Sequence, residues 1–550
     1  MPEIDTFATH EVLNQPPPLV DYNLFAGDRA LGEAVEREGA GWAAGWLRRL
    51  GEDCGRASSF ALGELANRHP PVLHSFDRFG RRRDEVEFHP AWHELMASLV
   101  ANGLHTGPWA EPKPGAHVAR AAGYMLHAQI EAGSLCPTTM TYGSVPALSR
   151  QPEIAKDWLP LLVSRRYDRR FRPASGKTGA LVGMGMTEKQ GGSDVRANTT
   201  HAQPVGAGGP AAEYRVTGHK WFFSAPMCDA FLVLAQAPGG LSCFFLPRFT
   251  PDGSLNAIHL QRLKEKVGNR SNASSEVEFH GAHAWLLGEE GRGVPTILEM
   301  GTYTRLDCAL GTTGLMRQAV SQALHHARHR TVFQRHLVDQ PLMANVLADL
   351  AIEAEAAMAL VMRLARAFDA ESDAGENAFR RLMTPVTKFW ICKRGPVLAA
   401  EAMEVLGGNG YVEEALLGRI YREMPVNSIW EGAGNIICLD VLRAAERAPD
   451  GLAAVLGEIE AAKGGDKRLD RYTADLKAAL ADHANAEAGA RRLTEGLALA
   501  LQASLLVRFS APAMADAFCA GRLEGHWSGA FGTLPAGIDA RAIIDRAMPN

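Results

Sequence analysis

Glu431 is the one carboxylate in the stretch "SIWEGAGNI", residues 428–436. Ile429 and Trp430 precede it and small residues follow it. Burial among apolar side chains disfavours the charged form of a carboxylate and raises its pKa toward neutrality, the range that a general base needs. The small residues after Glu431 leave room for a substrate. Taken alone, a buried glutamate paired with a distant arginine would explain the pattern equally well.

A second stretch, "MGMTEKQGGSDV" at 184–195, is rich in groups that bind ligands. Gly191 and Gly192 allow the backbone to approach a ligand closely, because they have no side chain. Thr187 and Ser193 offer hydroxyls. The alternative is a polar turn that leads into a sheet.

A third stretch, "TGHKWFFSA" at 217–225, has the composition of a strand that follows a turn. Phe222 and Phe223 should point to opposite faces of that strand, so one of them could flank a flat aromatic ligand. Ser224 could bond the edge of the same ligand. Structural aromatic residues are common in sheets, and this is the alternative.

A fourth set of residues could bind phosphate. Arg330, in "HRTVFQR" at 329–335, offers a guanidinium fork that suits a pyrophosphate. Gly407 and Gly408, in "EVLGGNGY" at 404–411, allow main-chain contact with phosphate oxygens, although such a pair often only ends a helix. His325 and His329 have metal-ligand spacing but no third ligand, so no metal site is predicted.

The elements that must position these residues follow one another in blocks. Helix-period patterns fill residues 1–179, and short β-branched or aromatic runs fill 180–290 as a sandwich or small barrel. Long amphipathic segments at 291–445 predict an antiparallel four-helix bundle. A further helical domain is expected at 446–550. The predicted fold class is therefore mainly α with a central β-domain, and a ligand clamped where sheet and bundle meet.

Bulk composition is that of an ordinary soluble protein. The 550 residues are 46% hydrophobic and 22% charged, with a net charge of −5. Eight cysteines form no Cys-x-x-Cys pair, which favours a reducing compartment. No signal peptide is visible, and no stretch approaches the roughly 18 apolar residues of a membrane span. A cytoplasmic protein without a membrane partner is expected.

These motifs, in this order, resemble those of the acyl-CoA dehydrogenase superfamily, which has the same helical, β and helical-bundle order. The resemblance is carried by "MTEKQGGSDV", "GHKWFFS", "RTVFQ", "VLGGNGY" and "REMPVNSIWEGAGNI". "KVGNRSNASSEVEF", "HAQIEAGSLCPTTMT" and the extra region beyond about 446 further resemble a branch of bacterial alkylation-response flavoproteins. The match covers essentially the whole chain.

The resemblance implies an FAD cofactor. The residues implied to line its isoalloxazine and ribityl chain are Met184, Met186, Thr187, Gly192, Ser193, Phe222, Phe223 and Ser224. A neighbouring subunit of a homotetramer would contribute the residues for the pyrophosphate and adenosine, which are Arg330, Gln334, Gly407 and Gly408. The loop implied to close over the flavin contains Ile429, Trp430, Gly432 and Asn435.

The resemblance also implies a reaction. Glu431 would remove the proton α to a thioester carbonyl, and a hydride would pass from the β-carbon to flavin N5. Arg305 is the candidate for contact with an acyl-CoA substrate. Trp430 stands where the family has Tyr, and Ala433 where it has Thr, so a narrow acyl pocket is expected.

The branch further implies duplex DNA binding and protection against DNA alkylation. Residues 451–550 hold 11 Lys and Arg against 12 Asp and Glu, so a DNA-binding face requires clustering. The candidates are Arg443, Lys463, Lys467, Arg468, Arg471, Arg491 and Arg492. A solvated surface that packs subunits is the alternative. Two other functions stay open: a catabolic short- or branched-chain dehydrogenase without a DNA role, and a DNA-binding flavoprotein with vestigial catalysis.

Overall fold

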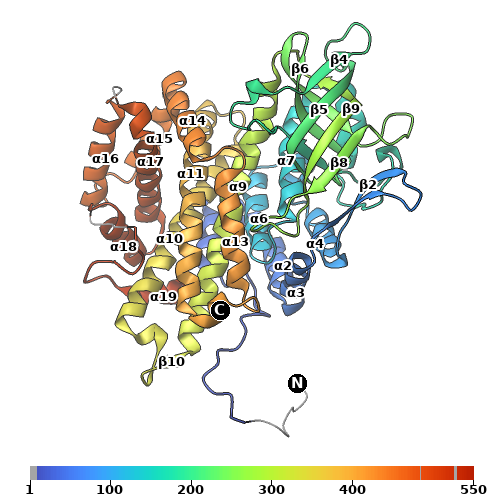
Figure 1. The fold of residues 1–550 in the computed structure, drawn as a ribbon. Helices are drawn as coiled ribbons and strands as arrows, with labels where there is room; N and C mark the ends of the chain where they lie inside the picture. Colours follow the sequence, from blue (N-terminus) through green and yellow to red (C-terminus); the bar gives the residue numbers. More distant parts are fainter. Residues whose placement is uncertain (1–8, 483–484, 526–528, 550) are drawn as a thin grey trace.

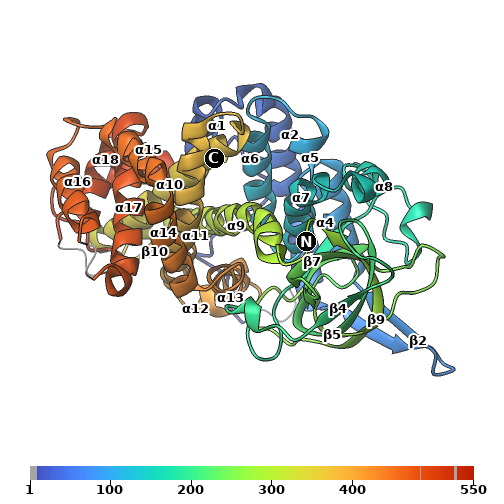
Figure 2. The ribbon, with the colours of Figure 1, turned by 90° about the horizontal axis from the view of Figure 1, so that it is seen from above.

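The computed structural model describes residues 9–482, 485–525 and 529–549. Helices make up most of it, and the strands β3 to β9, which come between two helical parts in the sequence, form a barrel at one side of the molecule (Figure 1). Seen from above, the barrel and the C-terminal helices lie on opposite sides of the central bundle (Figure 2). The predicted fold class is confirmed.

The N-terminal part is helical except for one hairpin. Its elements are α1 (Arg29–Arg37), η1 (Gly41–Ala43), α2 (Ala44–Gly55), α3 (Ala57–Arg68), β1 (Val72–Phe76), β2 (Arg82–Glu87), α4 (Pro90–Ala101), α5 (Gly107–Ala110), α6 (Ala116–Ala128), α7 (Leu135–Ser149) and α8 (Pro152–Leu162). The antiparallel hairpin β1–β2 was not predicted, because charged residues fill most of its second strand. Arg82 anchors the hairpin to the barrel by donating to the Leu260 carbonyl at 2.9 Å.

The middle part is a closed barrel. Its elements are η2 (Ala174–Gly176), β3 (Val182–Gly185), η3 (Val195–Ala197), β4 (His201–Pro204), β5 (Glu213–Ser224), β6 (Ala230–Ala237), β7 (Gly240–Pro247), β8 (Ile258–Leu263) and β9 (Ser274–Leu287). The ring closes because β5 pairs with β9, β9 with β7, β7 with β6, β6 with β3 and β3 with β5. Closure removes free edges from the ring, and aromatic side chains fill its interior.

The bundle consists of long helices that are buried along much of their length. Its elements are α9 (Gly293–His329), β10 (Thr331–Val332), β11 (Arg335–His336), η4 (Leu337–Asp339), α10 (Pro341–Asp369), α11 (Ala374–Val405), α12 (Gly408–Tyr411), α13 (Leu416–Ile429) and α14 (Gly434–Arg447). α11 contacts α9, α10 and α13. α9 and α10 are buried on nearly all sides, and the charged residues that they bury, such as Asp307 and Arg363, are paired.

Four C-terminal helices pack on the bundle face opposite the barrel (Figure 2): α15 (Pro449–Glu460), α16 (Lys467–Leu480), α17 (Ala486–Phe509) and α18 (Pro512–Arg522). The last helix, α19 (Ala540–Ala547), packs against α10 and α1. α15 and α17 contact α11, and α17 and α19 contact α10.

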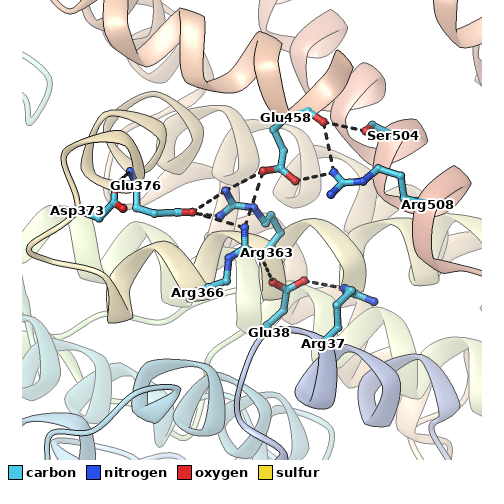
Figure 3. Close-up of polar contacts among 9 residues, drawn as sticks. All are labelled: Arg37, Glu38, Arg363, Arg366, Asp373, Glu376, Glu458, Ser504 and Arg508. Atoms are coloured by element: carbon cyan, nitrogen blue, oxygen red, sulfur yellow. Dashed lines mark hydrogen bonds and ion pairs between the residues drawn. The ribbon is translucent and has the colours of Figure 1, made fainter. Parts of the chain in front are cut away.

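A cluster of ion pairs joins this C-terminal region to the rest (Figure 3). Arg363 of α10 bonds Glu376 of α11 at 2.9 and 3.0 Å and Glu458 of α15 at 3.0 Å. Arg508 of α17 reaches the same Glu458 at 2.7 Å. Arg366 adds a contact to Glu38 at 3.1 Å, just beyond α1. Four helices and the N-terminal part are thereby fixed together.

All eight cysteines are buried free thiols. Among the described helices, none combines the length and apolar character needed to cross a lipid bilayer.

Candidate active site

The loop that carries Glu431 connects α13 to α14 by a sharp turn. Glu431 has a φ of 57° and Gly432 a φ of 109°. A non-glycine residue in this left-handed region is uncommon and costs energy, so surrounding contacts must hold it. Such positions concentrate at functional sites.

Two bundle helices clamp the loop. Thr304 of α9 donates its hydroxyl to the Glu431 carboxylate at 2.7 Å, and Arg305 donates to the Glu431 carbonyl at 3.0 Å. Lys388 of α11 donates to the Gly432 carbonyl at 2.6 Å. Both cations therefore bind the backbone of the loop, and the carboxylate itself accepts only the neutral hydroxyl among the described side chains.

Electrostatics suit Glu431 to proton abstraction. Burial raises the pKa of Glu431, and the Thr304 hydrogen bond and the charges of Arg305 and Lys388 offset this only in part. A carboxylate that holds its proton more tightly is a stronger base when it is ionised.

The barrel supplies the second half of the site at the ends of β3 and β5. Met184 lies opposite Ser224 in the antiparallel register. Met186 and Thr187 follow β3, and the Thr187 carbonyl accepts from Trp221 of β5 at 2.8 Å.

A turn folds back onto Thr187. A Cβ added at Gly192 would lie 2.4 Å from the Thr187 hydroxyl, so only glycine fits there. Ser193 follows and is exposed. The hydroxyls of Thr187 and Ser193 therefore come from neighbouring parts of one turn.

An ion pair that sequence reasoning missed holds this turn. Glu188 and Lys220 are fully buried and 2.6 Å apart. Burial opposes the charge on Glu188, but Lys220 and the amides of Thr199 and Thr200 outweigh it and lower the pKa to about 2. The sequence offered one signal for this pair, since each of the motifs "MTEK" and "GHKW" contains one of the two opposite charges.

The structure separates the two phenylalanines of β5. Phe222 is 47% exposed, whereas Phe223 is 0% exposed and packs against Phe231 and Phe279 inside the barrel. The prediction that the side chain of Phe223 lines a ligand is therefore wrong. That the ring of Phe222 flanks a flat aromatic ligand stays a prediction.

Buried groups connect the barrel half to the loop. Lys266 donates to the Ser274 hydroxyl at 2.9 Å, and Ser274 lies opposite Ser224 in the sheet register. Burial raises the pKa of Cys136 to about 12; Lys266 and Asn272 oppose this rise, and the charge of Glu431 adds to it. Thr141 of the same helix, α7, accepts from the Val182 amide of β3 at 3.0 Å, and α7 also packs against α9, which binds Glu431. The two halves therefore meet along α7.

The residues predicted to bind pyrophosphate lie elsewhere. Arg330 follows the end of α9, and Gln334 is in the exposed β10–β11 hairpin, far from the barrel in Figure 1. At about 1.5 Å per residue, the segment from Thr304 to Arg330 spans roughly 39 Å. Gly407 and Gly408 are exposed beyond the end of α11. One chain does not bring these residues to Glu431.

Other predicted residues have partners of their own. Arg305 also pairs with Asp440 at 2.7 Å, so its guanidinium bridges α9, the loop and α14. The Asn435 side-chain oxygen accepts from Arg491 of α17 at 2.9 Å. Ile429 is 63% exposed beside the partly buried Trp430.

Some of the cations predicted to bind DNA are exposed, and others are paired with carboxylates. Arg443 on α14 and Lys467 on α16 are exposed. Arg468 pairs with Asp466 at 2.6 Å and with Asp516 at 2.8 Å, and Arg471 lies 3.7 Å from Glu524. The paired arginines offer little net positive charge.

Known families match three parts of the chain between residues 14 and 446. "Adaptive response protein AidB N-terminal domain" matches residues 14–169, "Acyl-CoA dehydrogenase, middle domain" matches 183–282, and "Acyl-CoA dehydrogenase, C-terminal domain" matches 291–446.

Individual proteins agree with these matches. "Putative acyl-CoA dehydrogenase AidB" of Escherichia coli (strain K12) is 53% identical over 93% of this chain and 94% of its own length. The crystal structure of Caenorhabditis elegans ACDH-11 in complex with C11-CoA superposes with a TM-score of 0.85 at 25% identity, covering 94% of each chain. The Bacillus anthracis acyl-CoA dehydrogenase complexed with FAD has the same fold, with a TM-score of 0.63 at 20% identity over 78% of this chain and 80% of that one.

The fold and these matches define an FAD-dependent oxidoreductase of the acyl-CoA dehydrogenase type. The chain belongs to the acyl-CoA dehydrogenase family, in the branch that contains AidB. The predictions of family, enzyme class and FAD are confirmed.

The junction fits a flavin. Phe222 presents an exposed ring, Ser224 and Thr187 present hydroxyls, and Gly192 allows close approach. The Trp430 indole N–H is buried and has no acceptor among the described residues, so it is a donor available to a ligand.

Proposed function

We propose that the protein dehydrogenates an acyl thioester, with Glu431 as the base that removes the α-proton. When bound, FAD supplies the acceptor for the hydride that leaves the β-carbon. The observation that carries the proposal is a carboxylate with a raised pKa, clamped through its backbone at the junction of barrel and bundle.

The loop also offers a donor for the enolate. A proton next to a thioester is too weakly acidic for a carboxylate unless oriented donors stabilise the negative oxygen. The backbone N–H of Glu431 has no acceptor among the described residues. The turn at Glu431 thereby places a base and a free donor in one residue.

The proposed substrate is a short or branched acyl-CoA. The similar structure from C. elegans has C11-CoA as its ligand, which supports the thioester class. In this chain Trp430 is next to the base, and its bulk limits the room for an acyl chain.

Anaerobic mixing of the FAD-loaded protein with acyl-CoAs of increasing length tests this proposal. We expect the flavin absorbance to bleach fastest with short or branched chains. If no acyl-CoA bleaches the bound flavin, the dehydrogenase proposal fails and vestigial catalysis is supported. If FAD does not bind at all, the assignment of the site fails with it.

We also propose a homotetramer in which two chains share each FAD. The separation of Arg330 from Thr304 along α9 exceeds the reach of a single extended cofactor within one chain. A second copy must then supply Arg330, Gln334, Gly407 and Gly408. Light scattering that gives a monomeric mass for FAD-loaded protein would contradict this.

A protective role in DNA alkylation, through duplex binding in the cytoplasm, is the finer part of the proposal. Similarity to AidB and to the adaptive-response domain supports it. Arg443, Lys463 and Lys467 are exposed cations that could contact a duplex, whereas Arg468 and Arg471 are paired. A duplex gel shift that weakens with salt is expected, and the absence of any shift at low salt would remove the DNA role.

A further inference from the structure

We propose that Arg491 of the C-terminal region is a positioning residue of the flavin site: it orients Asn435 and so fixes the loop that carries Glu431. The inference rests on the proposed function, and it makes the extra helical region part of the active site.

Arg491 lies directly against the start of α14. Its Nε donates to the Asn435 side-chain oxygen at 2.9 Å. A Cβ added at Gly434 would lie 3.2 Å from the Arg491 guanidinium and 3.2 Å from the Lys393 side chain. The guanidinium is also 5.7 Å from the centre of the Phe389 ring of α11. The close approach of α17 to this turn therefore leaves little room beyond a hydrogen atom at 434.

The bond decides which way the amide of Asn435 points. An arginine side chain can only donate, so the oxygen of the amide must face Arg491 and its NH₂ group must face away. That NH₂ group has no acceptor among the described residues. Asn435 is therefore held as a hydrogen-bond donor, and it is one of the residues expected to contact FAD.

Three helices thus hold the loop from three sides. α9 binds Glu431, α11 binds Gly432 through Lys388, and α17 binds Asn435 through Arg491. The first two belong to the bundle, and the third comes from the C-terminal region. A change in the position of α17 would reach the loop through this third contact.

Arg492 provides a matched control. It is the next residue of α17 and is also exposed, and the structure shows no hydrogen bond or ion pair from it to the loop. Successive helix residues point about 100° apart, so the two arginines share charge and helix position but not direction.

The test measures FAD affinity of the apoprotein by titration, together with its melting temperature. We expect Arg491→Ala to weaken FAD binding about tenfold, as for loss of a hydrogen bond made by a charged group, and Arg492→Ala to leave it unchanged. Arg491→Lys should recover part of the affinity. The melting temperature of the apoprotein should be the same in Arg491→Ala and Arg492→Ala.

A double-mutant cycle tests whether Arg491 acts through Asn435. Asn435 is exposed, so Asn435→Ala should fold. In that background Arg491→Ala should add no further loss, because the shared contact is already gone. Equal FAD affinity of Arg491→Ala and Arg492→Ala, or additive losses in the cycle, would overturn the inference. Failure of the unaltered protein to bind FAD would instead overturn the proposed function.

Discussion

Glu431 and Glu458 are partly buried carboxylates that both contact the same helical bundle, and their surroundings are opposite. Glu431 accepts one side-chain hydrogen bond, from the neutral hydroxyl of Thr304, and burial raises its pKa. Burial also opposes the charge on Glu458, but Arg363 at 3.0 Å and Arg508 at 2.7 Å outweigh it, and the pKa of Glu458 is lowered (Figure 3).

The difference shows how the same type of side chain, a glutamate, can serve two purposes. Guanidinium groups around Glu458 stabilise its charge and turn it into a link between helices. Around Glu431 the cations Arg305 and Lys388 bind backbone carbonyls instead, so the loop is fixed while the carboxylate stays basic. The residues that fix the loop lower the pKa of Glu431 less than burial raises it.

The largest effect should come from removing the base. Glu431→Gln keeps the shape of the side chain but cannot accept a proton, so we expect the rate of flavin bleaching by acyl-CoA to fall about 10³-fold. FAD affinity should stay near that of the unaltered protein. Glu289→Gln, at an exposed glutamate between β9 and α9, is the control. Bleaching by Glu431→Gln at the normal rate would assign the proton to another group.

Breaking the other side of the comparison should cost stability instead. Arg363→Ala leaves Glu376 and Glu458 without their most buried partner, and we expect the free energy of unfolding to fall by about 3 kcal/mol. Arg366→Ala is the control, since its side chain is 37% exposed and should contribute less than about 1 kcal/mol. Denaturant midpoints measure both, and equal losses would show that burial does not decide the strength of the cluster.

A subtler change should shift the pH dependence. The Thr304 hydroxyl stabilises the ionised form of Glu431, so Thr304→Val should raise the pKa of Glu431 further. The base acts only when deprotonated, so the acid limb of the bleaching rate should move up by about one pH unit, equivalent to about 1.4 kcal/mol. The control is Thr302→Val, because Thr302 lies two residues before Thr304 on α9 and its hydroxyl bonds the Leu298 carbonyl instead of Glu431. An acid limb at unchanged pH would mean that the hydroxyl does not control the base.

The smallest effect should appear as acid sensitivity of the C-terminal helices. The folded-state pKa of Glu458 is lowered, so its contribution to stability is present above the ordinary glutamate pKa of about 4.3 and is lost as the pH falls through the folded value. Hydrogen exchange of α15 and α17 should therefore quicken below about pH 4. In Arg363→Ala this pH dependence should be flatter. Protection that is constant down to pH 3 would contradict the assignment.

Much of this arrangement could be read from the sequence because the signals are local. Glu431 stood out as a carboxylate among apolar and small residues, and periodicity separated the barrel from the helices. Periodicity also showed that Phe222 and Phe223 face opposite ways, but the direction of the barrel interior depends on strands such as β6 and β9, which lie far along the chain.

The contacts that tune the site could not be predicted in the same way. Arg491 and Asn435 are 56 residues apart, and Arg363 and Glu458 are 95 apart. Exposed and paired arginines look alike in a sequence, since pairing depends on how helices pack. The β1–β2 hairpin was missed for a related reason, because its charged second strand lacks an apolar alternation.

The length of α9 has a consequence for the working protein. One end of this helix meets the catalytic loop and the other carries Arg330, so each protomer under this proposal holds the two ends of different cofactors. Retention of the yellow prosthetic group then follows mass action between protomers. Dilution alone should therefore release FAD from the enzyme and lower its visible absorbance. Excess FAD should restore both the absorbance and the assembly.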